Sequence, residues 1–437
     1  MSSPTNSSIL VHKNETEADR VVSPRVSRGG ALVWYGLLVL AMVAGVVAFI
    51  IRAKEGLAST GLTTITPWGT WVAFYIYFVG MSAGAFLLST FIHVFGMERF
   101  HKVGREALLV AIISMVLALT FILLDLGRME RFWHVLWYFN PTSVLAWEVR
   151  FYVIYILLLA AELYFSMRQD LIRASRGTGW AARVAAVCTL GSKDLSEESV
   201  KRDHRILKVL GAIGIPIAIF GVHGGTGALF AVAKARPYLN SALLPVVFIV
   251  SALVSGTALL IASYTIRKKV SGQIPDREML KSLGGLLALF LSIDLGLEFY
   301  EFLIGAYGLE ATELATLKTI FAGQFAWSFW GIQMLVGAVI PLAILAYPRT
   351  RNSPAAIAAA AIMVVIGIVA VRFHIVLPSL IVPVMEGLPE GYYLPTWVEL
   401  ASSLGVIAFG LFLYSLAVTG LPIDVRQEID KGVKENE

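Results

Sequence analysis

Ten long runs of apolar residues alternate with short polar segments that hold almost all of the charged residues. A helix needs about 20 apolar residues to cross a hydrocarbon core ~30 Å thick. Each run reaches this length. The pattern therefore predicts ten membrane-spanning helices, at residues 31–51, 69–94, 106–125, 144–166, 209–230, 241–265, 282–304, 319–346, 354–376 and 397–418.

The composition supports the same class of protein. Of the 437 residues, 57% are hydrophobic and 15% are charged, and the mean hydropathy is +0.75. Lipid accepts only backbones that satisfy their own hydrogen bonds, so we expect an all-α polytopic membrane protein. Its transmembrane domain is predicted at 31–418, between a disordered tail at 1–30 and a second tail at 419–437. The first tail lacks the apolar stretch of a cleaved signal peptide.

Lysine and arginine are concentrated on one side of this arrangement. With the N-terminus inside, 26 of the 35 cations fall in the tails and loops of that side, seven fall outside, and two lie within spans. The positive-inside rule then predicts that both termini are cytoplasmic. It also explains the net charge of +5, which is no evidence for nucleic-acid binding. The single cysteine, Cys188, excludes a disulfide and an internal iron–sulfur cluster, which needs about four thiolates.

A faint internal repeat links residues 81–89 (MSAGAFLLS) with 253–261 (LVSGTALLI). It suits two related four-helix bundles, helices 2–5 at about 69–230 and helices 6–9 at about 241–376, plus two peripheral helices. Chance recurrence of small residues in membrane helices explains it equally well. The longest loop, 167–208, has room for one short interfacial helix beginning at Trp180 but for no core of its own.

Several polar residues lie in the outer halves of four consecutive spans. Ionisable groups are costly in lipid, so such residues are candidates for function. Consecutive helices tend to pack together, and we expect these side chains to converge on one pocket near the outer surface. The alternative for Asp125 is a simple pair with Arg128 at the membrane boundary. The residues concerned are Tyr75, Tyr77, Asp125, Glu148, Arg150 and His223.

Three carboxylates form a stripe on the seventh span. Asp294, Glu298 and Glu301 are spaced i, i+4 and i+7, which places them on one helix face. Such a stripe indicates a helix that lines water or a proton path. Salt bridges to Arg372 on the ninth span, or to an interfacial lysine, are the other interpretation.

The histidines do not favour haem. Axial ligands of a membrane cytochrome must face each other at one depth. Only His223 and His374 satisfy this condition, and they belong to different predicted bundles.

A separate feature is the aromatic outer loop 126–143, which holds six rings when His134 is counted. It suits a docking surface, the roof of a ligand pocket or a re-entrant turn lying on the membrane.

Three segments together resemble one known family. Residues 68–89 (WGTWVAFYIYFVGMSAGAFLLS) resemble the second-helix signature of the NrfD/PsrC membrane subunits. Residues 125–134 (DLGRMERFWH) and 140–148 (NPTSVLAWE) resemble its third-to-fourth-helix segment. His223 and the glycine-rich stretch after it resemble the fifth helix, and the likeness is continuous over about 65–265. Ten helices are closer to the hydrogenase-2, Dsr, quinone reductase and alternative complex III members than to the eight-helix branch.

This resemblance implies a haem-free subunit that handles quinone, either menaquinone or ubiquinone, in a prokaryotic cytoplasmic membrane. It implies no metal, haem or iron–sulfur cluster in this chain and no activity of the chain alone. A ferredoxin-like iron–sulfur subunit would dock at the outer face near 126–143. A molybdopterin, hydrogenase or cytochrome subunit is a further expected partner, besides the lipid bilayer.

The resemblance also assigns roles to single residues. His223 and Asp125 would bond the quinone oxygens and exchange protons, while Ser82 takes the position where some relatives have a histidine. The quinone pocket would be completed by Tyr75, Tyr77, Arg128, His134, Glu148 and Arg150. Proton translocation through Asp294, Glu298, Glu301 and Arg372 is an open possibility.

Two other functions fit part of the pattern. A secondary transporter also has ten or more helices, but its polar groups gather at the bilayer midplane. A structural anchor for peripheral subunits would explain the aromatic loop, yet it needs neither ten helices nor buried acids. Our prediction is therefore a membrane subunit that exchanges electrons between the quinone pool and an iron–sulfur partner.

Overall fold

The computed structural model describes residues 28–93, 100, 103–385 and 387–424. Over these residues the chain is helical, without a strand, and ten helices are long and apolar enough to cross a membrane. The fold class predicted from the hydrophobic pattern is therefore confirmed. The predicted tails at 1–30 and 419–437 lie largely outside the described residues.

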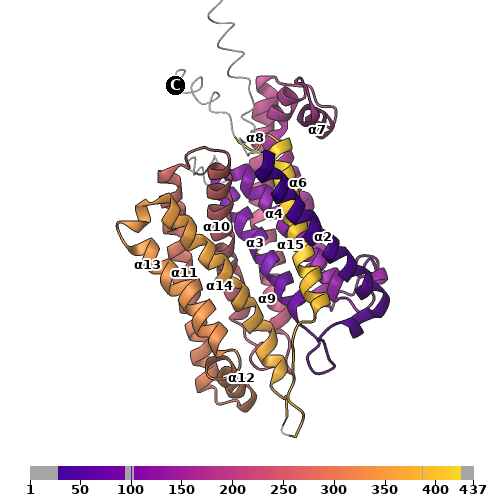
Figure 1. The fold of residues 1–437 in the computed structure, drawn as a ribbon, viewed down its shortest axis with the longest axis vertical. Helices are drawn as coiled ribbons and strands as arrows, with labels where there is room; N and C mark the ends of the chain where they lie inside the picture. Colours follow the sequence, from indigo (N-terminus) through magenta and orange to yellow (C-terminus); the bar gives the residue numbers. More distant parts are fainter. Residues whose placement is uncertain (1–27, 94–99, 101–102, 386, 425–437) are drawn as a thin grey trace, which may run out of the picture.

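The helices run roughly along the long axis of the molecule (Figure 1). The spanning elements are α2 (Arg28–Glu55), α3 (Thr70–His93), α4 (Gly104–Asp125), α6 (Val144–Ala174), α8 (Glu197–Pro216) continued by η4 (Ile217–His223) and α9 (Gly224–Ala231), α10 (Leu244–Val270), α11 (Arg277–Tyr307), η5 (Ser328–Val339) continued by α13 (Ile340–Ala346), α14 (Pro354–Ile381) and α15 (Trp397–Gly420). Short helices in the connections are η1 (Gly56–Ser59), η3 (Met129–Arg131), α5 (His134–Trp137), α7 (Trp180–Cys188), α12 (Ala311–Phe321) and η6 (Thr350–Asn352).

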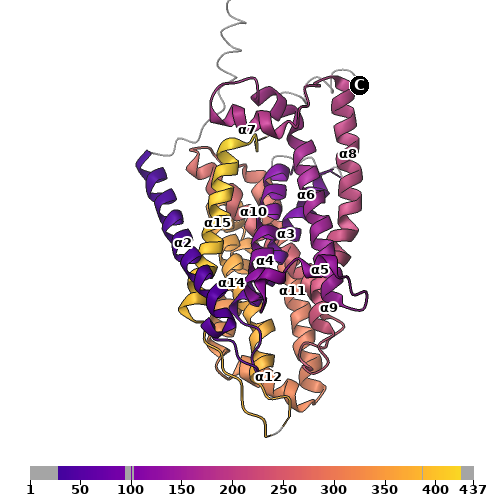
Figure 2. The same ribbon diagram turned by 90° about the vertical axis from the view of Figure 1, so that its right-hand side faces the viewer.

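The bundle has two ends. The end at which α2 begins and α15 ends is called the proximal face, and the opposite end, which carries α5 and α12, is called the distal face (Figures 1 and 2). The sequence predicts that the distal face lies outside the cell.

Helix boundaries depart from the prediction in two connections. The fifth span begins at Glu197 rather than at residue 209, because a Ser196 side-chain cap starts a polar helix well before the apolar run. The predicted span 319–346 is wrong at its start, since α12 ends at Phe321 and a new helix begins only at Ser328. The short helix expected at Trp180 is present as α7.

Helix α3 lies at the centre of the molecule, almost completely buried, whereas α2 packs against α15 at the edge with most of its apolar surface exposed (Figure 1). Central α3 crosses α10 where Gly84 meets Gly256. A Cβ on Gly84 would lie 1.9 Å from the carbonyl oxygen of Ala252, so only glycine permits this approach. Gly84 and Gly256 hold the same position in the two segments of the internal repeat, while the division into two related bundles stays a prediction.

Two spans contain π-helical turns, η4 and η5. A π-turn widens the helix and interrupts the regular i→i−4 hydrogen bonds, and such turns are frequent at functional sites. Here they include His223 at the end of η4 and Gln333 within η5. Both residues lie in the distal half of the bundle.

Candidate functional site

A buried carboxylate is the centre of the first polar cluster. The Tyr75 hydroxyl donates to Glu148 Oε1 over 2.6 Å, and the Tyr152 hydroxyl donates to the same oxygen over 2.5 Å. Tyr152 also lies 2.7 Å from the Thr226 hydroxyl, which in turn donates to the carbonyl of Val222. These four side chains, called the tyrosine–glutamate cluster, join α3, α6 and α9 within two turns of their distal ends.

One oxygen of Glu148 has no hydrogen-bond partner among the described residues. Oε2 is buried without a hydrogen bond, and the residue as a whole is only 1% exposed. A buried carboxylate oxygen without a donor is costly, so this atom is available to a ligand that carries a donor. Gly225 lies next to Glu148 and has no side chain. A Cβ placed on Gly225 would lie 3.9 Å from the Glu148 Cγ.

His223 lies three residues before Thr226 on the same span. Its side chain is 1% exposed, and Nε2 has no hydrogen-bond partner. Arg372 of α14 lies close enough to His223 for their charges to interact. His223 therefore stands between the tyrosine–glutamate cluster and a second polar cluster around Arg372.

That second cluster, called the arginine–acid cluster, crosses the other half of the molecule. Arg372 donates from Nη2 to the Ser251 hydroxyl over 2.9 Å, and its charge interacts with Asp294 and Glu298 of α11. Arg372 Nε and Nη1 have no hydrogen-bond partner. The expected interaction between the acid stripe and Arg372 is therefore present as a charge interaction at longer range than a direct salt bridge.

A chain of hydrogen bonds continues from Glu298. The Gln333 amide donates to Glu298 Oε1, and the Gln333 oxygen accepts from His374 Nδ1 over 2.5 Å. His374 Nε2 lies 2.8 Å from the Ser328 hydroxyl. Together with Arg372, Ser251 and Asp294, these residues complete the arginine–acid cluster.

Asp125 belongs to a different set of contacts from His223. It ends α4, where its charge interacts with Arg52 of α2 and Glu399 of α15. Arg52 donates to the carbonyls of Leu124 and Leu126 and lies over the Trp71 ring. The alternative considered for Asp125, a pair with Arg128, is not among the ion pairs of the described residues, and the charges near Asp125 are those of Arg52 and Glu399. Asp125 Oδ1 is buried without a hydrogen bond.

The remaining predicted pocket residues are dispersed. Tyr77 donates to the Val365 carbonyl at 3.3 Å and faces Arg372, so it belongs with the arginine–acid cluster. Ser82 lies deeper, where it donates to the Ala111 carbonyl over 2.7 Å. The single outer pocket predicted from the sequence is thus replaced by several neighbouring polar groups.

Arg150 organises the aromatic loop. Its guanidinium donates to the carbonyls of Val135 and Leu136 and lies 4.0 Å from the Phe139 ring centroid. The loop presents exposed apolar side chains at the distal face, and His134 makes edge-to-face contacts with the rings of Trp133 and Tyr138. The exposed side chains are Phe132, Trp133, Leu136, Trp137, Tyr138 and Phe139.

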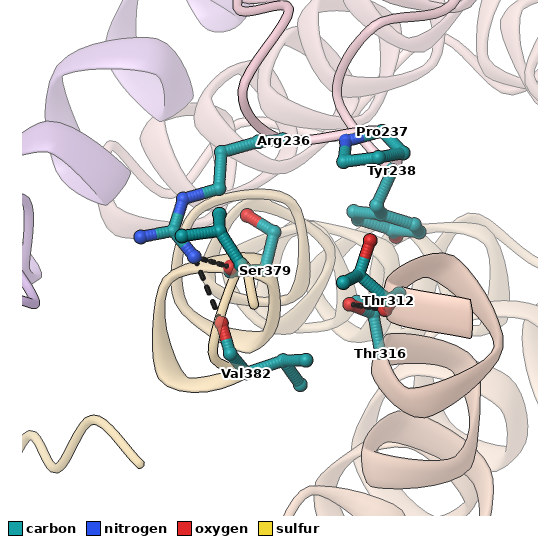
Figure 3. A pocket seen from close by; sticks show the side chains of 8 residues that line it. Arg236, Pro237, Tyr238, Thr312, Thr316, Ser379 and Val382 are labelled. Atoms are coloured by element: carbon teal, nitrogen blue, oxygen red, sulfur yellow. Dashed lines mark hydrogen bonds between the residues drawn. The ribbon is translucent and has the colours of Figure 1, made fainter. Parts of the chain in front are cut away.

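A small cavity of about 10 Å³ lies between the connection that follows α9, the short helix α12 and the end of α14 (Figure 3). Arg236 closes one side by donating to the carbonyls of Ser379 and Val382, and Tyr238 lies beside Thr312 and Thr316 of α12. Burial raises the pKa of the Tyr238 hydroxyl above its ordinary value, and nearby Glu298, Glu301 and Glu313 raise it further. The cavity has room for about one water molecule.

Sequence reasoning did not assign Tyr152, Thr226, Ser251, Gln333 or His374 to a site. A signal existed for two of them, because Glu148 and Tyr152 are i, i+4 on one helix face, and Gln333 is a strongly polar residue within an apolar span. Within the described part of the chain, no group of three or more His, Cys, Asp and Glu side chains is placed to hold a metal ion.

Comparison with known proteins decides the family. The model of the family "Polysulphide reductase, NrfD" matches residues 58–384. The chain belongs to the NrfD family. It is 40% identical over 411 residues to one of the subunits of the selenate reductase of Mesobacillus selenatarsenatis, covering 90% of this chain and 95% of the relative.

Two further relatives have names that refer to menaquinol or menaquinone. The Hdr-like menaquinol oxidoreductase integral membrane subunit of Archaeoglobus fulgidus is 26% identical, over 93% of this chain and 98% of the relative. The integral membrane subunit of the menaquinone reductase of Nitratidesulfovibrio vulgaris is 25% identical, over 91% and 93%. The family predicted from the motifs is thereby confirmed, and the chain is a multi-pass membrane protein related to membrane subunits of reductases.

Proposed function

We propose that this NrfD-family chain is the quinone-binding membrane subunit of a respiratory oxidoreductase and exchanges electrons between the membrane quinone pool and an iron–sulfur partner. The observation that carries the proposal is the pair of buried, unpartnered atoms Glu148 Oε2 and His223 Nε2 on neighbouring spans. The names of the menaquinol and menaquinone relatives support a quinone as the ligand.

The residues present fit a quinone head group. A quinone has two opposed oxygens, and a hydroquinone has two hydroxyls, so each end needs a group that can both donate and accept. His223 offers such a group in its imidazole. The tyrosine–glutamate cluster offers the other, through the Glu148 carboxyl group and the hydroxyls of Tyr75 and Tyr152. A bound quinone would supply a two-electron, two-proton redox centre there.

Protons would pass through the chain's own residues. His223 would hold or release a proton at Nε2, and Glu148 would do so at Oε2. Arg372 lies near His223 and also near Asp294 and Glu298, so it would connect this proton site to the acids of α11. Asp125 remains a second candidate for proton exchange, from the separate position at the end of α4.

The electron partner would dock on the distal face. The exposed rings of the 126–143 loop form an apolar surface next to the start of α6, within a few residues of Glu148. Arg150 and Arg52 hold this loop through its backbone carbonyls, so its shape is coupled to the helices that carry the site. This surface suits a ferredoxin-like subunit that would bring a cluster close to the quinone.

The acid stripe would serve as a proton path from His223 toward the distal surface. Arg372 connects His223 to Asp294 and Glu298, and Glu301 follows on the same helix face. Tyr238, whose hydroxyl group is near enough to Glu298 and Glu301 to be affected by their charges, lines a small cavity that has room for water (Figure 3). For a protein of a prokaryotic inner membrane with both termini in the cytoplasm, this path would end at the non-cytoplasmic surface of the membrane.

The rival function is a secondary transporter with a polar site at the midplane. Asp294 favours it most, because this residue lies near the middle of α11. The other groups lie toward the distal ends of their helices, which a site reachable from both sides does not require.

One experiment separates the two functions. Wild-type and His223→Ala chains are purified gently from native membranes, co-purifying subunits are identified by mass spectrometry, and quinone-dependent electron transfer is measured. We expect an iron–sulfur subunit in both preparations and a loss of turnover of at least about 10²-fold in His223→Ala. The control His204→Ala changes an exposed residue of α8 and should keep full turnover.

Normal turnover in His223→Ala would remove His223 from the site. A wild-type chain that purifies alone and without quinone would contradict the relay and favour the transporter.

A further inference from the structure

A cavity of about 270 Å³ lies at the proximal face, remote from both polar clusters. It is formed where α11 begins, α13 ends and α14 begins, and its lining residues are Lys281, Gly284, Gly285, Leu345, Arg351 and Ile357. This position corresponds to the boundary between the hydrocarbon core and the aqueous phase, because the apolar spans start and end there.

The shape of the cavity follows from the two glycines. A Cβ on Gly284 would lie 3.3 Å from side-chain atoms of both Leu345 and Ile357, so α11 packs tightly against them at that position. Gly285, one residue further, has nothing within 4 Å of a Cβ position and is exposed. The surface is therefore hollowed beside Gly285, with an apolar wall of Leu345 and Ile357.

Two cations flank the apolar wall. Lys281 is one turn before Gly285 on α11, and Arg351 lies in η6, and both are exposed. The neighbouring Arg277 donates to the Asn352 carbonyl over 2.7 Å, which holds η6 against the start of α11. This contact keeps Arg351 on the same side of the cavity as Lys281.

We propose that this cavity binds an anionic phospholipid, with the phosphate between Lys281 and Arg351 and an acyl chain along Gly285, Leu345 and Ile357. Charge and position together favour this occupant. Basic pockets between transmembrane helices on the cation-rich side of a membrane protein suit acidic head groups. A free phosphate would use only the two cations and would leave the apolar wall without a function. The proposal is independent of the quinone site.

The test uses the full chain in its native complex after detergent exchange removes loosely bound lipid. Native mass spectrometry counts retained phospholipid, and binding is titrated with phosphatidylglycerol, phosphatidylcholine or inorganic phosphate. We expect phosphatidylglycerol to bind and the other two not to compete. Each interfacial cation is worth about fivefold in affinity for an acidic lipid, so Lys281→Ala/Arg351→Ala should bind ~25-fold more weakly.

Two matched variants make the result specific. Lys281→Arg/Arg351→Lys keeps both charges and should retain the lipid. Arg176→Ala/Lys193→Ala removes the same number of exposed proximal cations away from the cavity and should also retain it. Equal binding by Lys281→Ala/Arg351→Ala and the wild type would overturn the proposal, and so would full displacement of the lipid by inorganic phosphate.

Discussion

The two carboxylate oxygens of the buried Glu148 are used differently. Oε1 accepts hydrogen bonds from both Tyr75 and Tyr152, whereas Oε2 has none. The tyrosines therefore fix the orientation of the carboxyl group and aim the free oxygen away from themselves. A carboxyl group that is positioned in this way is suited to exchange a proton with a ligand rather than to stabilise the fold.

Replacing Glu148 tests this role against that of Asp125. Glu148→Gln preserves the shape of the side chain but removes the exchangeable proton, so quinone-dependent turnover should fall by about 10²-fold or more. Asp125→Asn removes the acid at the end of α4, and we expect a smaller loss because the charge of Asp125 interacts with Arg52 and Glu399 rather than with residues of the span of His223. Steady-state quinol oxidation by the purified complex measures both variants. A greater loss in Asp125→Asn than in Glu148→Gln would reverse the assignment.

Single residues were easier to predict from the sequence than their partners. The cost of charge in lipid identified Asp125, Glu148, His223 and Arg372 one at a time, and each is indeed buried to a large extent. Their grouping depends on how each helix is rotated about its axis. Tyr75 and Asp125 lie at the distal ends of adjacent helices, yet they contact different neighbours. Hydropathy carries no information about that rotation.

A second group of buried charges ties elements together at the proximal face. Glu106 of α4 is fully buried and accepts from Arg267 of α10 over 2.8 Å and from Tyr414 of α15 over 2.5 Å. Arg267 also pairs with Asp424, which follows α15, over 3.0 Å. These contacts join three helices that are far apart in sequence, and they lie at the opposite end of the bundle from the candidate quinone site.

Arg267→Ala should destabilise the fold without changing the turnover of the folded complex. It leaves the buried Glu106 without its cation, and breaking a buried pair in this way costs about 3–5 kcal/mol. Thermal unfolding of the purified chain should shift to clearly lower temperature, while turnover per folded complex is kept. Lys269→Ala changes an exposed cation two residues along and serves as the control. An unchanged unfolding temperature would contradict this structural role.

The same contacts have a defined pH dependence. Partial burial raises the pKa of Asp424, but Arg267 and Lys268 lower it by more, so that pKa lies below its ordinary value. A carboxylate with a lowered pKa stabilises the folded state above its unfolded pKa and loses this contribution as the pH falls through the folded pKa. The difference in unfolding temperature between wild type and Asp424→Asn should therefore be present at neutral pH and shrink on acidification.

At the level of elements, the apolar runs predicted the spanning helices well because lipid leaves few other structures possible. The π-turns of η4 and η5 were not predicted. Ile217–His223 is an apolar run ending in histidine, and nothing in its hydropathy distinguishes an α-turn from a π-turn. Within η4, Gly221 lies against the Phe151 ring of α6, where a Cβ would come within 2.6 Å, a contact that hydropathy does not reveal.

Across the whole molecule, the buried polar residues of the distal half form two neighbouring clusters. The tyrosine–glutamate cluster uses α3, α6 and α9, and the arginine–acid cluster uses α10, α11, η5 and α14 together with Tyr77 of α3. Arg372 reaches from the second cluster toward His223 of the first. A change of charge at His223 would therefore alter the electrostatic environment of Asp294 and Glu298, and under the proposed function this coupling would link quinone chemistry at His223 to proton movement.

Glu298→Gln tests whether this connection moves protons across the membrane. The substitution keeps a polar side chain next to Gln333 but removes the ionisable group between Asp294 and Glu301. If the stripe is a path, proteoliposomes that contain the variant complex should oxidise quinol at a rate near that of the wild type, within about twofold, while the number of protons translocated per electron falls. Asp294→Asn should act in the same direction, because both carboxyl groups interact with Arg372.

Glu278→Gln, an exposed change at the proximal start of α11, is the control and should leave the ratio unchanged. A Glu298→Gln complex with an unaltered proton-to-electron ratio would show that the stripe serves only to balance the charge of Arg372.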